Sequence, residues 1–353
     1  MTSLLEQRYR TVLRMLPSSY RARREEEMVD VYLQDFDEED RDELRPSWGE
    51  VASIAALAVR TRMGSADAPI RYAVAGAGMR LFALLSILLH AARQLTDRAM
   101  SVAWYTGAPG EDRELALSLF EVDDPLAFVR VACQLVLPLC WVAAYATLLR
   151  DRRRAALVLT VLAALPGLWV FADPLTGVAG FPSGYALASM TFAWLTVLAV
   201  GCGFHSDAPA ARMPLAAPAG LTLMAVCVLM GLSVVMWATG SGPDFTWSSG
   251  TAFTVSVLIW YAARARGAHG TQDPSQPLAF AALGLAVLAE RAGMHAVLAE
   301  GRFTGPIVAA GWAQSAVIGV LVTALAVSGT RAVRRSAREE AARGADSATD
   351  SAV

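Results

Sequence analysis

The sequence Arg150-Asp151-Arg152-Arg153-Arg154 separates two long apolar runs, at 127–149 and at 155–172. Each run is long enough to cross a bilayer, because a membrane-spanning helix needs roughly 20 apolar residues. Short loops rich in arginine stay on the cytoplasmic side of a membrane. The sequence therefore predicts a cytoplasmic loop at this point. The side of every other loop then follows by counting apolar runs in both directions.

The whole chain repeats this pattern of apolar runs and short loops. It has 353 residues, of which 55% are hydrophobic, whereas a soluble domain has about 45–50% apolar residues. The net charge of -2 gives no field that would attract nucleic acid, so we expect no direct nucleic-acid binding. All basic side chains are arginine, a habit of bacterial genomes rich in G and C. The predicted spans are 70–92, 127–149, 155–172, 185–204, 215–238, 248–263, 278–298 and 306–328.

We therefore expect an all-α fold, a polytopic bundle of about eight transmembrane helices in the cell membrane with both termini cytoplasmic. The bundle occupies residues 70–330 and follows a short linker at 64–69. The basic segment 331–353 is rich in alanine, serine and aspartate towards its end, which predicts a cytoplasmic and largely disordered tail. No apolar segment of a secretory signal peptide is visible near the start, where the first sixty or so residues are highly charged.

Residues 1–63 read as a separate small domain of three helices on the cytoplasmic side. Ser3 with Glu6, and Ser47 with Glu50, have the spacing of capping boxes that open helices. Pro17 separates the first two helices. The first helix has its apolar residues at helical spacing on one face, at Leu5, Tyr9, Val12, Leu13 and Leu16. Three short helices bury little apolar area alone, so the domain should pack on itself, on a second copy or on a partner.

These residues also resemble a known family. The pattern comprises Leu4, Leu5, Tyr9, Leu13, Leu16, Pro17, Tyr20, Arg21, Arg24 to Met28, Tyr32, Phe36 and Pro46 to Trp48. It is similar to the HAAS-type and permease-prefix cytoplasmic helical domains of bacterial, and in particular actinobacterial, membrane proteins. The resemblance implies a regulatory or signalling role and a cytoplasmic partner such as a PadR-like transcription regulator. It covers the first sixty residues and brings no catalytic residue.

Catalytic motifs are absent from the sequence. It contains no GxSxG, Walker-type, HExxH or CxxC pattern. The four cysteines lie inside apolar runs, and the four histidines are far apart, so neither set has metal-ligand spacing. We therefore expect no metal, no cofactor and no catalytic residue. Any energy coupling would need an ion gradient or an ATPase partner.

The main candidate site is formed by Glu290, Arg291 and His295 in the seventh predicted span. Ionisable groups inside a bilayer are costly and usually face the bundle interior or a wet cavity. Counting ~1.5 Å per residue from the cytoplasmic side places Glu290 roughly 18 Å deep and Arg80, in the first span, roughly 15 Å deep. The sequence therefore predicts a pair between Arg80 and Glu290. The alternatives are a ligand or proton site at Glu290, and an Arg291 that reaches outward with no role.

Two functions from different classes fit these observations. The first is a membrane-embedded sensor or regulatory protein that relays a membrane or small-ligand signal to a cytoplasmic partner through its N-terminal helices. The second is a transporter or permease subunit with an intramembrane site near Glu290. A lipid-modifying membrane enzyme fits less well, because no catalytic constellation is present. A homo-oligomer is compatible with each of these functions.

Overall fold

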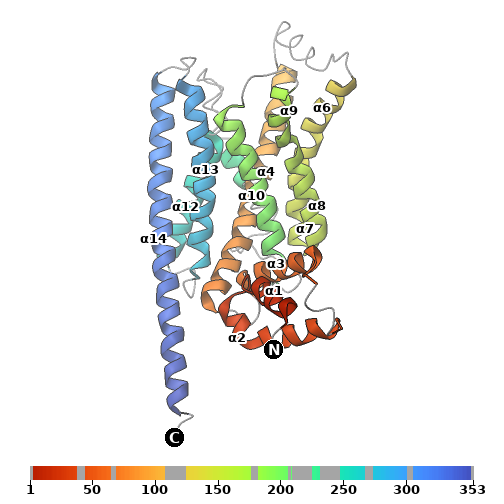
Figure 1. Ribbon diagram of the computed structural model, residues 1–353. Helices are drawn as coiled ribbons and strands as arrows, with labels where there is room; N and C mark the ends of the chain where they lie inside the picture. The colour runs from red at the N-terminus through yellow and green to blue at the C-terminus, as the bar shows by residue number, and fades with distance from the viewer. Residues whose placement is uncertain are drawn as a thin grey trace.

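A computed structural model describes residues 3–37, 44–64, 69–107, 125–175, 182–205, 208, 225–230, 247–266, 273–299 and 305–350. These residues form helices and no strand. Six of the described helical segments are long and apolar enough to cross a membrane, namely 70–99, 128–149, 153–172, 184–203, 275–298 and 308–340. The protein is therefore an all-helical, multi-pass membrane protein. Figure 1 shows its helices running side by side, with a smaller group of helices at one end.

The N-terminal group consists of α1 (Leu4–Leu13), α2 (Ser18–Gln34) and α3 (Trp48–Arg62). They share a small apolar core that is separate from the core of the bundle. Ser47 forms the predicted capping box, since its hydroxyl accepts from the Glu50 amide at 3.2 Å and the Glu50 carboxylate accepts from the Ser47 amide at 2.5 Å. At Ser3 the hydroxyl accepts from the Glu6 amide at 3.3 Å, while the Glu6 carboxylate turns to an arginine.

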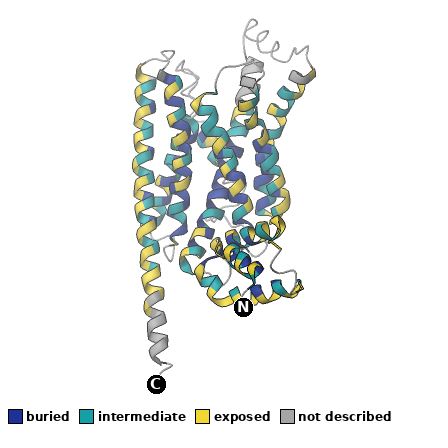
Figure 2. Ribbon diagram, in the orientation of Figure 1, coloured by how far each residue is buried: buried dark blue, intermediate teal, exposed yellow. Residues whose placement is uncertain are grey.

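The longer helices form the bundle. They are α4 (Ile70–Gly107), α6 (Pro125–Val136), α7 (Cys140–Leu149), α8 (Arg153–Ala164), α9 (Trp169–Leu175), α10 (Gly184–Gly203), α12 (Trp247–Ala265), α13 (Ser275–Ala299) and α14 (Gly305–Asp350). Helix α13 contacts α4 and α10 on one side and α12 and α14 on another. Helix α13 therefore connects α4 and α10 with α12 and α14. Among the six apolar segments, those in α4 and α13 are the most deeply buried (Figure 2).

The arginine loop turns the chain between α7 and α8. Asp151 has a φ of 57°, a left-handed conformation that aspartate tolerates better than most residues. Its carboxylate accepts from the Arg153 guanidinium at 2.8 Å, which helps to hold the turn. A 3₁₀ turn separates α6 from α7, η1 (Leu137–Leu139), and another separates α8 from α9, η2 (Leu165–Leu168). Each 3₁₀ turn contains a proline, Pro138 in η1 and Pro166 in η2, because proline lacks the amide hydrogen that a continuous α-helix needs.

Two of the predicted spans, 215–238 and 248–263, are not among the six apolar segments. Most of the span predicted at 215–238 lies outside the described residues, which include helical residues 225–230. The span predicted at 248–263 is helix α12. This helix is long enough but begins with several serine and threonine residues, and it is not among the six apolar segments.

The disordered tail predicted for 331–353 is wrong for most of its length, because α14 continues as one helix to Asp350. Alanine, arginine and glutamate favour helix, and extending an existing helix avoids the costly nucleation step. Both termini lie at the same end of the bundle, where α14 projects past the other helices (Figure 1).

Candidate functional site

A buried ion pair joins three helices inside the bundle. The Glu290 side chain, on α13, is 0% exposed and accepts from Arg93 Nη1 of α4 at 2.8 and 3.1 Å. Ser189 of α10 donates its hydroxyl to the same carboxylate at 2.7 Å. Arg93 also donates to the Tyr185 hydroxyl at 3.0 Å. We call Arg93, Tyr185, Ser189 and Glu290 the polar cluster.

Two glycines bring α10 and α13 close enough to form this cluster. A Cβ added to Gly293 would lie 2.5 Å from the backbone of Gly184 and Tyr185, nearer than real Cβ atoms come to other atoms. Only the absence of a side chain on Gly293 permits this approach. Ser183 caps α10 by accepting from the Ala186 amide at 3.2 Å, so its first turns are helical at the contact. Helical spacing then places Tyr185 and Ser189 on one face, towards Glu290.

The cluster satisfies the carboxylate that it buries. A buried charge without partners costs several kcal/mol, whereas a fully bonded network is stable and geometrically specific. Both Glu290 oxygens accept hydrogen bonds, and one of them has two donors. This arrangement fixes α4, α10 and α13 relative to one another.

The predicted pair between Arg80 and Glu290 is wrong. Arg80 donates to the Met63 carbonyl, at the end of α3, with a length of 3.5 Å. Arg80 and Arg93 are 13 positions apart on α4, which is about 20 Å along a helix. The depth count failed because α4 begins against the N-terminal helices, so its first turns are not level with the first turns of α13.

Arg291 and His295 lie on the side of α13 that faces α12 and α14. The Arg291 side chain is 0% exposed, and its guanidinium carbon lies 5.8 Å from the centre of the Trp247 ring. The alternative in which Arg291 reaches outward is therefore wrong. His295 accepts from or donates to the Ser315 hydroxyl at 2.8 Å and stacks on Trp312, with ring centres 3.9 Å apart. The structure thus separates Arg291 and His295 from the polar cluster.

Sequence reasoning missed three members of the polar cluster. Arg93 lies one residue beyond the predicted end of the first span, but α4 continues to Gly107. Tyr185 and Ser189 carry ordinary polar groups near a helix start, and their spacing of four residues was the available signal. His90, one turn before Arg93, packs its ring 4.4 Å from Trp141 and 4.5 Å from Phe192. Aromatic packing therefore covers one end of the cluster.

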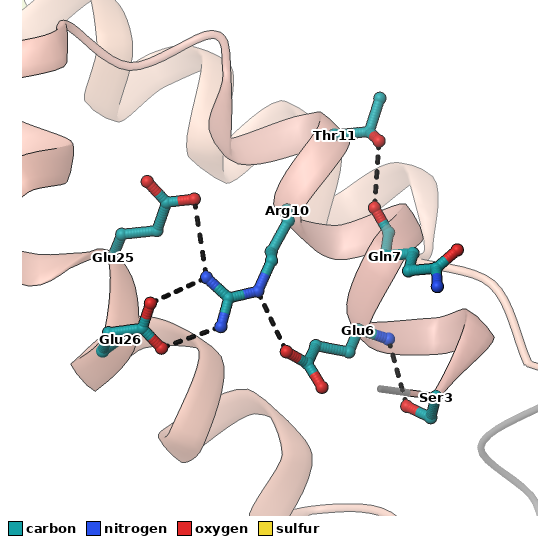
Figure 3. Close-up of polar contacts among 7 residues, drawn as sticks. All are labelled: Ser3, Glu6, Gln7, Arg10, Thr11, Glu25 and Glu26. Carbon is teal, nitrogen blue, oxygen red and sulfur yellow. Dashed lines mark hydrogen bonds and ion pairs between the residues drawn. The ribbon is translucent and has the colours of Figure 1, made fainter. Parts of the chain in front are cut away.

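A second polar group joins α1 to α2 in the N-terminal unit (Figure 3). Arg10 donates to Glu6 at 2.9 Å and to Glu26 at 2.9 and 2.7 Å, and it lies 3.7 Å from Glu25. The hydrogen bond from Arg10 holds the pKa of the exposed Glu26 carboxyl below its usual range. This unit is attached to the bundle where Gly76 of α4 meets Met63, because a Cβ at Gly76 would lie 1.8 Å from the Met63 carbonyl oxygen.

The described residues include no group of three or more His, Cys, Asp or Glu side chains arranged to hold a metal ion. Comparison with known proteins gives no family. No family model matches the chain, and no curated protein or solved structure is significantly similar to it.

Proposed function

We propose that the chain is an integral membrane signalling protein in which the state of the bundle is relayed to the N-terminal helices. The observation that carries this proposal is the path of α4. This single helix, Ile70–Gly107, meets α3 near its start and brings Arg93 to Glu290 further along. A change at the polar cluster that moves α4 also moves the surface on which the N-terminal unit rests.

The polar composition of the N-terminal unit supports a cytoplasmic partner. The unit has its own core, and its surface carries an exposed tryptophan, Trp48, together with many charged side chains. Its resemblance to HAAS-type domains implies a PadR-like regulator as that partner. We place the unit, and both termini, on the cytoplasmic side of the cell membrane, because the arginine loop between α7 and α8 lies at the same end of the bundle as the unit.

An arrangement of eight crossings is part of this proposal. Gly203, at the end of α10, packs on Arg80 near the N-terminal unit. Trp247, at the start of α12, accepts from Gln314 in the third turn of α14, near the opposite end of the bundle. We propose that the span predicted at 215–238, most of which lies outside the described residues, crosses the membrane between these two residues and that α12 crosses back.

Amide hydrogen exchange tests the relay in the full-length protein reconstituted in lipid. Glu290→Gln removes the charge that pairs with Arg93, so exchange should change within α3 and the first turns of α4. The matched control is Ser315→Ala, which removes a half-buried hydroxyl contact on the other side of α13. This control should leave α3 unchanged. Identical exchange at residues 48–62 in wild type and Glu290→Gln would contradict the relay.

A transporter remains the second candidate, since Glu290 is a buried carboxylate at the junction of three helices. The existing bonds to both carboxylate oxygens favour the relay, because a proton or substrate would have to displace them. Liposomes loaded with a pH-sensitive dye separate the two functions. Proton flux that wild type supports and Glu290→Gln abolishes would favour the transporter.

A further inference from the structure

Four exposed arginines follow the apolar part of α14. They are Arg331, Arg334, Arg335 and Arg338, and we call them the arginine stripe. Their spacing of three, four and seven residues places them on one side of a continuous helix. None of them forms an ion pair among the residues that the structure describes.

The stripe lies on the side of α14 that points away from the bundle. The inner side is marked by Ile318 and Leu325, which are both 0% exposed, and by Gly329, which packs on Leu278. The outer side carries Val320, 69% exposed, and Val327, 41% exposed. From Val327, Arg331 and Arg334 follow at four and seven residues, which is the repeat of a single helical face. The lipid-facing side of α14 therefore changes from valine to arginine residues.

The 20 residues from Val308 to Val327 span about 30 Å at ~1.5 Å per residue, so they match the hydrocarbon core and the arginine stripe follows at the depth of the headgroups. The hydrocarbon core of a bilayer is about 30 Å thick, and the headgroup regions add about 5–7 Å on each side. At ~1.5 Å per residue, Arg331 lies about 6 Å past Val327, and Arg334 and Arg335 lie about 11 Å past it. Long arginine side chains reach back several ångströms towards the interface. Arg338 lies deeper in the aqueous phase but within about one Debye length of the surface, ~8–10 Å.

We propose that the arginine stripe binds the phosphates of anionic lipid headgroups, in the leaflet at the end of the bundle where both termini lie. The guanidinium group suits this ligand, because its planar fork can donate two hydrogen bonds to one phosphate. The direction of the stripe favours lipid over a partner within the bundle, since the stripe continues the lipid-facing side. The inference requires only that the chain spans a membrane, and it is independent of the proposed relay.

Native mass spectrometry of the full-length protein tests this site. The protein is extracted from vesicles of phosphatidylcholine and phosphatidylglycerol in equal amounts, and the retained lipids are counted. Wild type should retain several-fold more phosphatidylglycerol than phosphatidylcholine. The fourfold variant Arg331→Gln, Arg334→Gln, Arg335→Gln and Arg338→Gln should lose most of that preference.

A face-exchange variant is the matched control, because it keeps composition and net charge unchanged. Each arginine changes places with its neighbour, so that arginine stands at 332, 333, 336 and 337 instead. By helical spacing, these positions lie on the sides of α14 that point away from the arginine stripe. We expect this variant to lose the preference as the fourfold variant does. Retention of wild-type preference by either variant would overturn the proposal, as would a wild type without any preference; the hydrogen-exchange test of the relay is unaffected by each result.

Discussion

At the scale of single residues, the polar cluster gives the sharpest prediction. Glu290→Gln should leave the Arg93 charge buried without its partner and destabilise the protein by ~3–5 kcal/mol, the usual cost of breaking a buried pair. The double substitution Arg93→Leu with Glu290→Leu should recover most of that loss. Thermal unfolding of the detergent-purified variants measures both effects. The control is Arg80→Gln, which removes only a long bond of 3.5 Å to the Met63 carbonyl and should cost little. A Glu290→Gln variant as stable as wild type would contradict this account.

The core of the N-terminal unit gives a second prediction at this scale. Leu13, the last residue of α1, is 0% exposed, whereas Leu4, the first residue of the same helix, is 47% exposed. Leu13→Asp should unfold α1–α3, because an unpaired charge in a small core is severely destabilising. Leu4→Asp should be tolerated. Limited proteolysis of the full chain reads both variants, with early cleavage within residues 4–62 expected only for Leu13→Asp. Equal cleavage of the two variants would show that this core does not hold the unit together.

At the scale of elements, the contact between α10 and α13 depends on the absence of a side chain. Gly293→Ala would place a methyl group 2.5 Å from the α10 backbone, so the helices must separate and Ser189 must move away from Glu290. Gly319→Ala is the matched control, since a Cβ there meets nothing within 4 Å. The control should be neutral or stabilising by ~0.4–1 kcal/mol, as alanine for glycine in a helix usually is. Thermal unfolding should rank Gly293→Ala below wild type and Gly319→Ala at or above it. The opposite order would contradict the close approach.

The packing of α1, α2 and α3 predicts a pH dependence. Burial, followed by the nearby Glu50 carboxylate, raises the pKa of Tyr32 to about 12. Tyr32 also stacks on Tyr9, with ring centres 3.9 Å apart. A pKa raised in the folded state means that folding favours the neutral phenol. This stabilisation is complete below pH ~10, the ordinary tyrosine pKa, and is lost as the pH rises towards 12.

The measurement is an alkaline titration of tyrosinate absorbance in wild type and in Tyr32→Phe. The difference between the two curves reports the titration of Tyr32. Its midpoint should lie clearly above pH ~10. A midpoint at the ordinary value would show that Tyr32 is not buried beside Glu50.

At the scale of the whole molecule, the two ends of the bundle should face opposite sides of the membrane. The test uses a variant in which Cys133, Cys140, Cys202 and Cys227 are replaced by alanine. Arg154→Cys is in the first turn of α8 and Ser336→Cys is towards the C-terminal end of α14, whereas Gly305→Cys is the first residue of α14. The two ends of α14 lie at opposite ends of the bundle (Figure 1). An impermeant thiol reagent applied to intact cells should label Gly305→Cys only. Labelling of Arg154→Cys before permeabilisation would reverse the proposed orientation.

The all-helical membrane architecture and most of the helix positions follow from local patterns in the sequence. Apolar runs of membrane length, cap residues at Ser47 and the proline at Pro166 act locally, so they are visible without a structure. The arginine loop also marks the hairpin of α7 and α8, in which Asp151 supplies the turn. Glu290 was also recognisable from the sequence as a buried charge. A carboxylate within an apolar run is costly and needs a partner inside the bundle.

The partner of Glu290 and the end of α14, in contrast, are visible only once the helices are packed together. The pairing depends on the relative heights of α4 and α13, and Gly78 of α4 lies beside the first residue of α13, since a Cβ there would be 3.6 Å from the Ser275 carbonyl oxygen. Residue counting from each helix start cannot supply these heights, so it selected Arg80 instead of Arg93. The end of α14 depends on continuation from a helix already held in the bundle, which composition alone does not reveal. Local patterns therefore fix the helices, whereas contacts between distant glycines and side chains fix how those helices meet.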